Sequence, residues 1–136
     1  MLIDLHTHTY PLSWDSQLNA DELVERSKAA GLDGIMLSEH DWAWNPDDVR
    51  ALAARHNFVV LHGIEVNTDG GHVLIVGPAR YTYAMRRPAE LARMVREADG
   101  AMWGAHPYRR HYPQDWDDEA ACAAAVERAA ANEALQ

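Results

Sequence analysis

Short apolar runs that alternate with helical segments are the feature of this sequence that most restricts its fold. The runs with the composition of β-strands lie at residues 2–8, 33–40, 58–66, 72–77 and 101–107. Helical segments with capping signals separate most of them. Because strands that alternate with helices favour parallel pairing, this order predicts an α/β fold with a largely parallel sheet. The length of 136 residues predicts a single domain, residues 1–136.

The first helical segment has signals for both of its ends. Asn19 is an N-cap residue, and Glu22 supplies the other half of a capping box. Gly31 suits the left-handed conformation that ends a helix. The expected inner stripe of this helix consists of Leu23, Val24, Ser27 and Ala30.

Other local signals place the remaining elements. Pro46, after the N-cap residue Asn45, predicts a second helix, and Pro88 predicts a third. Residues 67–71 are rich in Asn, Asp and Gly, so we expect a turn that joins the flanking strands as a hairpin. The alanine-rich segment 117–135 predicts a final helix.

Composition excludes several classes of protein. Hydrophobic residues make up 48% of the sequence, which excludes an intrinsically disordered chain. No apolar run approaches the roughly 18 residues that span a bilayer, and the N-terminus lacks the pattern of a signal peptide, so we expect no membrane partner. Cys122 is the only cysteine, which fits a reducing, cytoplasmic location. The net charge of -9 disfavours anionic partners on average, although bound cations would change the local sign.

Two histidines stand at the end of the first strand-like run. Strand side chains repeat with a period of two, so the rings of His6 and His8 are expected on the same face. Two imidazoles on one face suit a shared metal ion. The alternative is a pair of exposed histidines at a strand end, and the short motif alone does not decide between them.

The same kind of residue recurs at the ends of later strands. His40 ends the second strand-like run, Glu65 the third and His106 the fifth, whereas His72 begins the fourth. In parallel α/β folds, active sites form at the carboxyl ends of strands. The recurrence therefore predicts one metal site. Glu65 is the expected bridging ligand, because its two oxygens can contact two ions.

Other titratable residues have competing interpretations. Asp15 could reach the same face as a ligand or could form an Asx turn. Asp41 could orient a ligand or cap a turn. We expect His56 to interact with a helix dipole or to pack, and His62 to support the site or to be structural. For His111 we favour a structural role.

Several short motifs, taken in order, resemble those of the polymerase and histidinol phosphatase (PHP) family. They are DLHTHT (4–9), SEHD (38–41), GIEVN (63–67), GHVL (71–74) and AHP (105–107). The resemblance implies a distorted (β/α)7 barrel that binds two or three divalent ions, variously zinc, manganese or iron, and hydrolyses phosphoesters. It further implies that His6 and His8 bind a first ion and that Glu65 bridges this ion to a second. His72 and His106 would complete the shell of the second ion.

The resemblance also implies that Asp15 and His40 bind a third ion. We expect a metal-activated water to hydrolyse a phosphate monoester or diester, with Glu65, His40 and Arg109 as the catalytic residues. Arg109 would clamp a phosphate, whereas a solvated loop charge is the alternative for it and, more strongly, for Arg110.

The expected substrate is a small phosphorylated molecule of the nucleotide, sugar phosphate or histidinol phosphate class, or an oligonucleotide. Four aromatic residues in loops could stack on a base or sugar of such a substrate, or could cover the end of the barrel. These residues are Tyr10, Trp14, Trp42 and Trp44.

One departure from the family pattern lies at the C-terminus. Family members generally continue to an Asp-x-His motif that supplies further ligands, and this sequence has no histidine after His111. Three explanations are a truncated sequence, a second chain or oligomer that completes the site, and a degraded relative. We favour truncation, because a partial barrel exposes sheet edges that native proteins avoid. An exposed edge or apolar surface is therefore expected.

Two other functions remain open. An amidohydrolase-type barrel also begins with His-x-His, but many such enzymes need a lysine at a strand end. Lys28, the only lysine, lies in the first predicted helix, which disfavours that branch. The second alternative is a metal-stabilised domain without catalytic activity.

Overall fold

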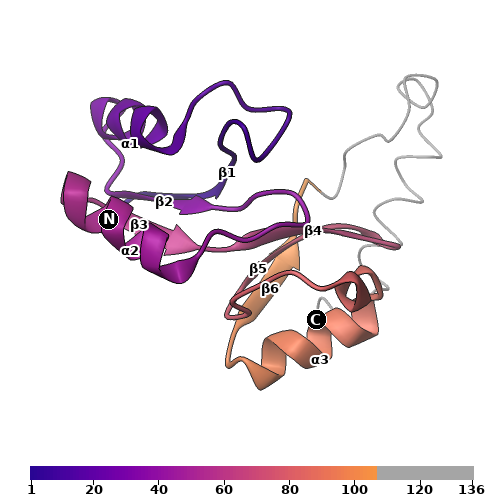
Figure 1. Ribbon diagram of the computed structural model, residues 1–136. Helices are drawn as coiled ribbons and strands as arrows, with labels where there is room; N and C mark the ends of the chain where they lie inside the picture. The colour runs from indigo at the N-terminus through magenta and orange to yellow at the C-terminus, as the bar shows by residue number, and fades with distance from the viewer. Residues whose placement is uncertain (107–136) are drawn as a thin grey trace.

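The computed structural model describes residues 1–106, which form a mixed α/β structure (Figure 1). Its elements, in chain order, are β1 (Ile3–Thr7), α1 (Ala20–Ala29), β2 (Gly34–Leu37), α2 (Pro46–His56), β3 (Val59–His62), β4 (Ile64–Thr68), β5 (Gly71–Val76), the 3-10 helix η1 (Tyr83–Arg86), α3 (Pro88–Glu97) and β6 (Ala101–Gly104). The predicted helix 117–135 lies outside the described residues, as do Arg109, Arg110, His111 and Cys122.

The strands form two three-stranded sheets of different kinds. In the first, β1, β2 and β3 are parallel and adjacent in that order. In the second, β5 lies between β4 and β6 and is antiparallel to both. The expected α/β class with a parallel sheet is confirmed, and so is the hairpin of β4 and β5. The expectation of a largely parallel sheet holds only for the first half of the described chain.

The path of the chain between β5 and β6 explains the antiparallel pairing. The backbone N–H of Asp69, in the turn before β5, donates to the carbonyl of Arg86 at 2.9 Å. The connection after β5 has therefore returned to the end of the sheet where β5 began. Helix α3 then runs back, and β6 begins with Ala101 opposite Val76, the last residue of β5. The order strand, helix, strand in the sequence is the same whether or not the connection returns in this way, so it does not predict the antiparallel pairing.

A second difference concerns the run 58–66, which was expected to be one strand. It is divided at Gly63 into β3, which pairs with β2, and β4, which pairs with β5. The N–H of Gly63 still donates to Leu37 O at 3.0 Å, and Glu65 N donates to Glu39 O at 3.0 Å. The chain thus passes from one sheet to the other while it remains bonded to the segment that extends β2.

Local signals in the sequence set the helix ends. The N-cap Asn19 accepts from Glu22 N at 2.9 Å, and the Glu22 carboxylate accepts from Asn19 N at 3.1 Å, which confirms the capping box. Gly31 has a φ of +84°, as expected after a helix. Asn45 caps α2, with Pro46 in its first turn. Ala30, expected on the inner stripe, is exposed because it is already the C-cap of α1.

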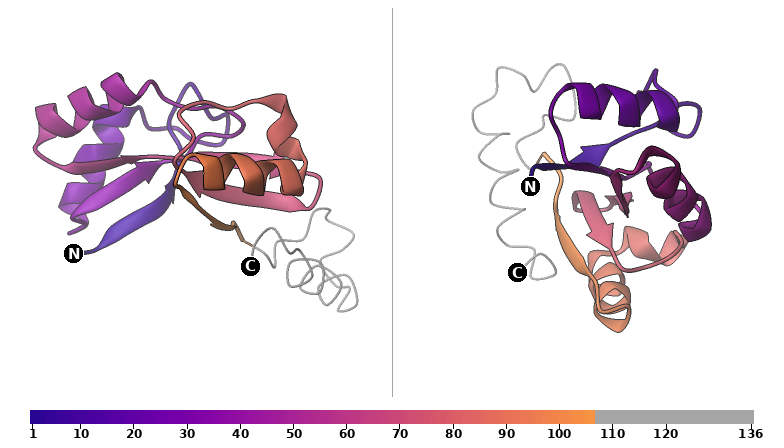
Figure 2. Two further views of the ribbon diagram at one scale, coloured as in Figure 1. Left: turned by 90° about the horizontal axis from the view of Figure 1, so that it is seen from below. Right: turned by 90° about the vertical axis from the view of Figure 1, so that its left-hand side faces the viewer.

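Helices α1, α2 and α3 follow one another around one side of the strands (Figure 2, right). Apolar side chains fill the space between the two layers in separate clusters. Those beneath α1 and α2 include Val24, Ile35, Leu37, Val49 and Leu52, and those beneath α3 include Ile64, Val66, Ile75, Leu91 and Val95. Among residues 1–106, no helix is both long and apolar enough to cross a bilayer.

An exposed sheet edge was also expected. Within the described residues, β1 is hydrogen-bonded only to β2, and β6 only to β5. Leu5 in β1 is 43% exposed, and Leu2 just before the strand is 61% exposed.

Candidate metal centre

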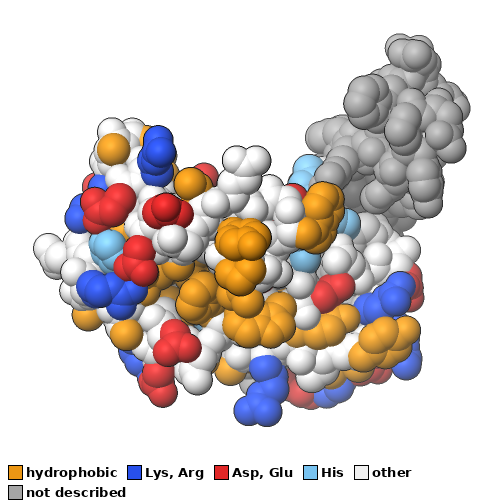
Figure 3. Space-filling view, turned by 45° about the horizontal axis from the view of Figure 1, so that its top comes forward, with side chains coloured by type: hydrophobic (Ala, Val, Ile, Leu, Met, Phe, Trp, Pro, Cys, Tyr) orange, Lys and Arg blue, Asp and Glu red, His pale blue; other side chains and the backbone are white. Residues whose placement is uncertain are grey.

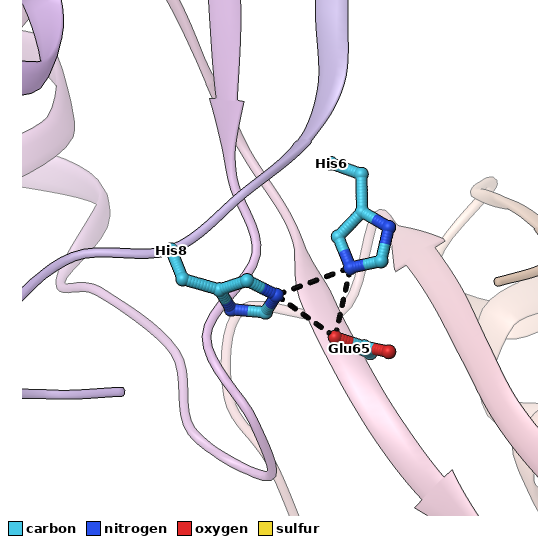
Figure 4. Close-up of side chains that lie close together, drawn as sticks. All are labelled: His6, His8 and Glu65. Carbon is cyan, nitrogen blue, oxygen red and sulfur yellow. Dashed lines mark hydrogen bonds and ion pairs between the residues drawn. The ribbon is translucent and has the colours of Figure 1, made fainter. Parts of the chain in front are cut away.

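A buried glutamate in β4 lies at the centre of a cluster of histidines. The Glu65 side chain has no exposed surface. Its Oε2 atom lies 2.9 Å from His6 Nε2 and 3.0 Å from His8 Nε2 (Figure 4). Its other oxygen, Oε1, lies 2.7 Å from His72 Nδ1 and 3.0 Å from His106 Nε2. The two oxygens of one carboxylate therefore contact two different pairs of imidazoles.

Strand register explains how these residues reach one another. Glu65 pairs with Leu74 and Asn67 pairs with His72, so Glu65 and His72 lie on the same face of the hairpin. The N–H of Ala105 donates to His72 O at 2.9 Å, which holds the end of β6, and hence His106, beside β5. Glu65 was expected to end a strand, but the division at Gly63 makes it the second residue of β4.

The first sheet contributes the other side of the cluster. His6 lies in β1 and His8 just after it, and their Nε2 atoms are 3.1 Å apart. The ring of His40, which follows β2, stacks on that of His8 with centroids 4.5 Å apart and an interplanar angle of 14°. His40 Nε2 contacts Asp15 Oδ2 at 3.1 Å. The structure therefore brings all seven expected metal-binding residues into one cluster.

Charge and burial shift the pKa values of the residues in this cluster in opposite directions. Burial by itself would raise the pKa of Glu65, but hydrogen bonds from His6, His72 and His8 hold it far below the ordinary value. For His8, burial would lower the pKa, yet Glu65 and the charges of Asp15 and Glu39 raise it. Burial would raise the pKa of Asp15, and the hydrogen bond with His40 lowers it. The acidic groups therefore favour positive charge at this point.

The donor atoms fit divalent metal ions. Three groups have ligand atoms that all lie within 4.8 Å of one another, namely His6–His8–Glu65, His8–Asp15–His40 and His40–Glu65–His72. His40 Nδ1 is buried without a hydrogen-bond partner in the described structure, and it lies 3.4 Å from Glu65 Oε2. If the ring protons that now bond to Glu65 were lost, the imidazole nitrogens would direct lone pairs at the same space as the carboxylate, and a cation bound there would stabilise them.

A cavity of about 260 Å³ opens at the cluster and is lined by His6, His8, Asp15, His40, Glu65 and His106. On the face shown in Figure 3, some of the exposed apolar side chains lie next to histidine side chains. Of the four expected loop aromatics, Tyr10, Trp14 and Trp42 are exposed. Trp44 is less exposed and packs edge-on against Trp42 with ring centroids 6.3 Å apart.

Three other expected residues lie around the cluster or away from it. Asp41 accepts from both the backbone N–H and the side chain of Asn67, at 2.8 and 2.9 Å, and so joins the loop after β2 to β4. His62 Nε2 contacts Trp44 O at 2.9 Å. His56 lies on α2 and contacts acidic residues of α1 instead of the cluster.

Sequence reasoning missed one buried residue, Glu39, which follows β2 immediately before His40. Its carboxylate is fully buried, and Oε2 lies 4.0 Å from His8 Nδ1. It accepts hydrogen bonds from Thr9, Ser13 and Trp44. A second acidic residue beside a strand-end histidine was the available signal, but no local pattern indicated that its side chain would be buried.

This chain resembles a family model and two solved structures. The family model of the PHP domain matches residues 4–122. A Bifidobacterium adolescentis protein described as a candidate metal-dependent phosphoesterase is 23% identical, with a TM-score of 0.52 over 70% of this chain, and supports the fold. An amidohydrolase structure from Chromobacterium violaceum with bound sulfate and no metal is 28% identical over 73% of this chain, with a TM-score of 0.49.

The chain covers 34% of the length of each of these two solved structures. No curated protein matches it. The family match, in contrast, covers most of the sequence and includes every residue of the histidine cluster. This chain therefore belongs to the PHP domain family.

Proposed function

We propose that this chain carries the metal-binding part of a phosphoesterase that hydrolyses a phosphate monoester or diester. Membership of the PHP family and the His/Glu clusters support a metal-dependent hydrolase. The observation that carries the proposal is the geometry of Glu65, whose Oε2 faces His6 and His8 and whose Oε1 faces His72 and His106. A carboxylate placed between two pairs of imidazoles is suited to bridge two cations.

In this proposal His6 and His8 would hold one ion, His72 and His106 would hold a second, and Glu65 would supply a carboxylate oxygen to each. Imidazole and carboxylate donors suit zinc, manganese and iron. When bound, such ions neutralise charge on a phosphoryl group and lower the pKa of water. The protein's own contribution is to fix the donor atoms before the substrate arrives, because Glu65 is fully buried and cannot rotate freely.

The His40–Asp15 pair has two candidate uses. It could bind a third ion, or His40 Nε2 could hold a proton, oriented by Asp15 Oδ2 at 3.1 Å, for the leaving oxygen of the substrate. A stoichiometry of three ions would favour the first use, and two ions would favour the second. Arg109 stays the proposed phosphate clamp.

The proposed whole protein is a (β/α)7 barrel to which the described strands contribute one part. Further strands, from a longer chain or from another copy, would pair with the edges of β1 and β6. The proposed substrates are small phosphorylated molecules of the nucleotide, sugar phosphate or histidinol phosphate class, with oligonucleotides as a further candidate. The exposed aromatic residues Tyr10 and Trp14 are suited to stack on such a molecule.

The test is to strip the full chain with a chelator, reload it with zinc, manganese or ferrous iron, and measure metal content and hydrolysis. p-Nitrophenyl phosphate and bis-p-nitrophenyl phosphate represent the two ester classes. We expect Glu65→Ala and His8→Ala to lose bound metal and at least about 100-fold in hydrolysis, because both remove an expected ligand. Glu97→Ala, which removes an exposed carboxylate of α3, is the matched control.

Hydrolysis that survives in Glu65→Ala would contradict the proposed role of this carboxylate. Stoichiometric metal without turnover of either ester would contradict phosphoesterase activity of this chain and favour a metal-stabilised domain. Turnover of amides without turnover of phosphoesters would instead favour an amidohydrolase.

A further inference from the structure

The residues that follow β2 continue its parallel pairing onto β4. Glu65 N donates to Glu39 O at 3.0 Å, and Asp41 N donates to Glu65 O at 2.9 Å. Between these two bonds, His40 and Glu65 form a parallel bridge. A histidine of the cluster is therefore held beside the buried carboxylate by backbone bonds between the two segments.

At Asp41 a side chain takes over from the backbone. In a regular parallel ladder the next bond would run from Asn67 N to the carbonyl oxygen of Asp41. The φ of Asp41 is +49°, which turns its backbone out of the strand direction. Asn67 N donates instead to Asp41 Oδ1 at 2.8 Å, and Asn67 Nδ2 donates to Oδ2 at 2.9 Å. We call these two bonds the Asp41–Asn67 clamp.

The clamp joins the segments that carry two histidines of the cluster. Asp41 directly follows His40, and Asn67 pairs with His72 across the hairpin of β4 and β5. The rings of His40 and His72 stand edge to face, with centroids 5.7 Å apart and an interplanar angle of 81°. Donor atoms of His40, Glu65 and His72 all lie within 4.8 Å of one another.

We infer that Asp41 and Asn67 are positioning residues that fix the separation of His40 and His72 on either side of Glu65. They act through the backbone, because a slip of one segment along the other would change the distance between the two rings. The clamp requires an acceptor at residue 41 and not a charge. Its value to metal binding rests on the proposed function, whereas the clamp itself belongs to the metal-free fold.

Two substitutions at residue 41 separate the clamp from backbone strain. Asp41→Gly removes both acceptor oxygens, and glycine adopts a positive φ without strain. Asp41→Asn keeps the clamp, because its amide oxygen accepts from Asn67 N and its amide nitrogen donates to the Asn67 side chain once that amide is turned over. Asparagine also tolerates a positive φ. Asp99→Gly is the matched control, because Asp99 is exposed after α3 with a φ of +50°.

Hydrogen exchange of the metal-free full chain, followed by NMR, tests the clamp. We expect the Asn67 backbone N–H to exchange at least about 10-fold faster in Asp41→Gly, because its acceptor is lost. Its exchange should stay near the wild-type rate in Asp41→Asn and in Asp99→Gly. Asn67→Ala removes only the side-chain bond, so the N–H of residue 67 should be accelerated less than in Asp41→Gly.

Cobalt(II) is the probe for the effect on the donor atoms, because its visible absorption spectrum depends on the geometry of its ligands. We expect a dissociation constant about 10-fold higher and an altered spectrum in Asp41→Gly. Asp41→Asn and Asp99→Gly should keep the wild-type spectrum and an affinity within about threefold. A merely structural effect would lower the denaturant midpoint and leave the spectrum of the bound cobalt unchanged.

Unchanged exchange of the Asn67 N–H in Asp41→Gly would overturn the clamp. Faster exchange together with wild-type cobalt affinity and spectrum would overturn the positioning role and leave the proposed function intact. If Asp41→Gly does not fold, Asn67→Ala takes its place, and a wild-type cobalt spectrum in that variant would likewise overturn the positioning role. A wild-type chain that binds no cobalt would overturn the proposed function, while the exchange experiment still decides the clamp.

Discussion

At the scale of single residues, the histidines of this chain have separate roles that depend on their neighbours. His56 illustrates the difference from the metal cluster. Its Nδ1 lies 2.7 Å from Glu25 Oε1, and its Nε2 lies 2.6 Å from Asp21 Oδ1. A neutral imidazole can donate from only one nitrogen, so two carboxylate partners favour the imidazolium. His56 therefore forms ion pairs from α2 to α1, and Arg55 adds another at 2.7 Å from Asp21.

This arrangement makes a pH-dependent contribution to stability. The hydrogen bonds from Asp21 and Glu25 raise the pKa of His56, and those from His56 and Arg55 lower the pKa of Asp21. The contribution of His56 is full below its ordinary pKa of about 6.5 and is lost as the pH rises through the raised value. The contribution of Asp21 is present above about pH 3.9 and is lost as the pH falls below it.

We therefore expect His56→Gln to lower the free energy of unfolding most near about pH 5.5 and least near about pH 8.5. Urea titrations of the metal-free variant and wild type at both pH values measure the difference. Subtracting the wild-type curve removes the titration of His8 and other common groups. A destabilisation that is the same at both pH values would contradict a charged His56.

At the scale of secondary-structure elements, Gly63 is the position where the chain changes sheets. A Cβ atom built there would lie 2.6 Å from Met36 Sδ and 3.0 Å from the carbonyl oxygen of Ile75. The methionine side chain can move, but the carbonyl belongs to the hydrogen-bonded strand β5. The close approach of three strand segments at this point therefore requires a residue without a side chain.

Gly63→Ala is expected to lower the free energy of unfolding by roughly 1–3 kcal/mol through this overpacking. Gly104→Ala is the matched control, because Gly104 also lies in a strand and its built Cβ has no atom within 4 Å. Denaturant unfolding of both variants under identical conditions measures the difference in their free energies of unfolding. Equal stability of the two variants would show that the strand segments separate at little cost.

At the scale of the whole molecule, the metal cluster connects the two sheets. His6 and His8 come from β1 and its continuation, whereas His72 and His106 come from β5 and the end of β6. Glu65 contacts both pairs. An ion bound by these residues would bind the folded chain and not an unfolded chain whose ligands are far apart.

Metal binding should therefore raise the melting temperature. A ligand present at 100 times its dissociation constant stabilises the folded state by about 2.7 kcal/mol, which corresponds to a rise on the order of 10 °C for a chain of this size. Differential scanning fluorimetry with and without zinc measures the shift, and a chelator should reverse it. The Glu65→Ala variant should show little shift. An equal shift in that variant would place the bound metal elsewhere.

The sequence by itself determined the local features. Asn19 with Glu22, and Asn45 with Pro46, mark helix starts by hydrogen bonds and a fixed φ that depend only on near neighbours. The hairpin of β4 and β5 follows from its turn residues in the same way. The His-x-His motif also placed two ring nitrogens close together, because strand side chains alternate.

Only the tertiary structure decided the direction of β6, the division of the run 58–66 and the burial of Glu39. Each depends on contacts between segments far apart in sequence, such as Asp69 with Arg86 or Glu39 with Thr9. Strand periodicity is the same for parallel and antiparallel neighbours, and a glutamate has the same letter whether solvent or buried donors surround it. The recurrence of ligand residues at strand ends did predict that His6, Glu65 and His106 converge. That they do so across two sheets of different kinds was decided by the tertiary structure.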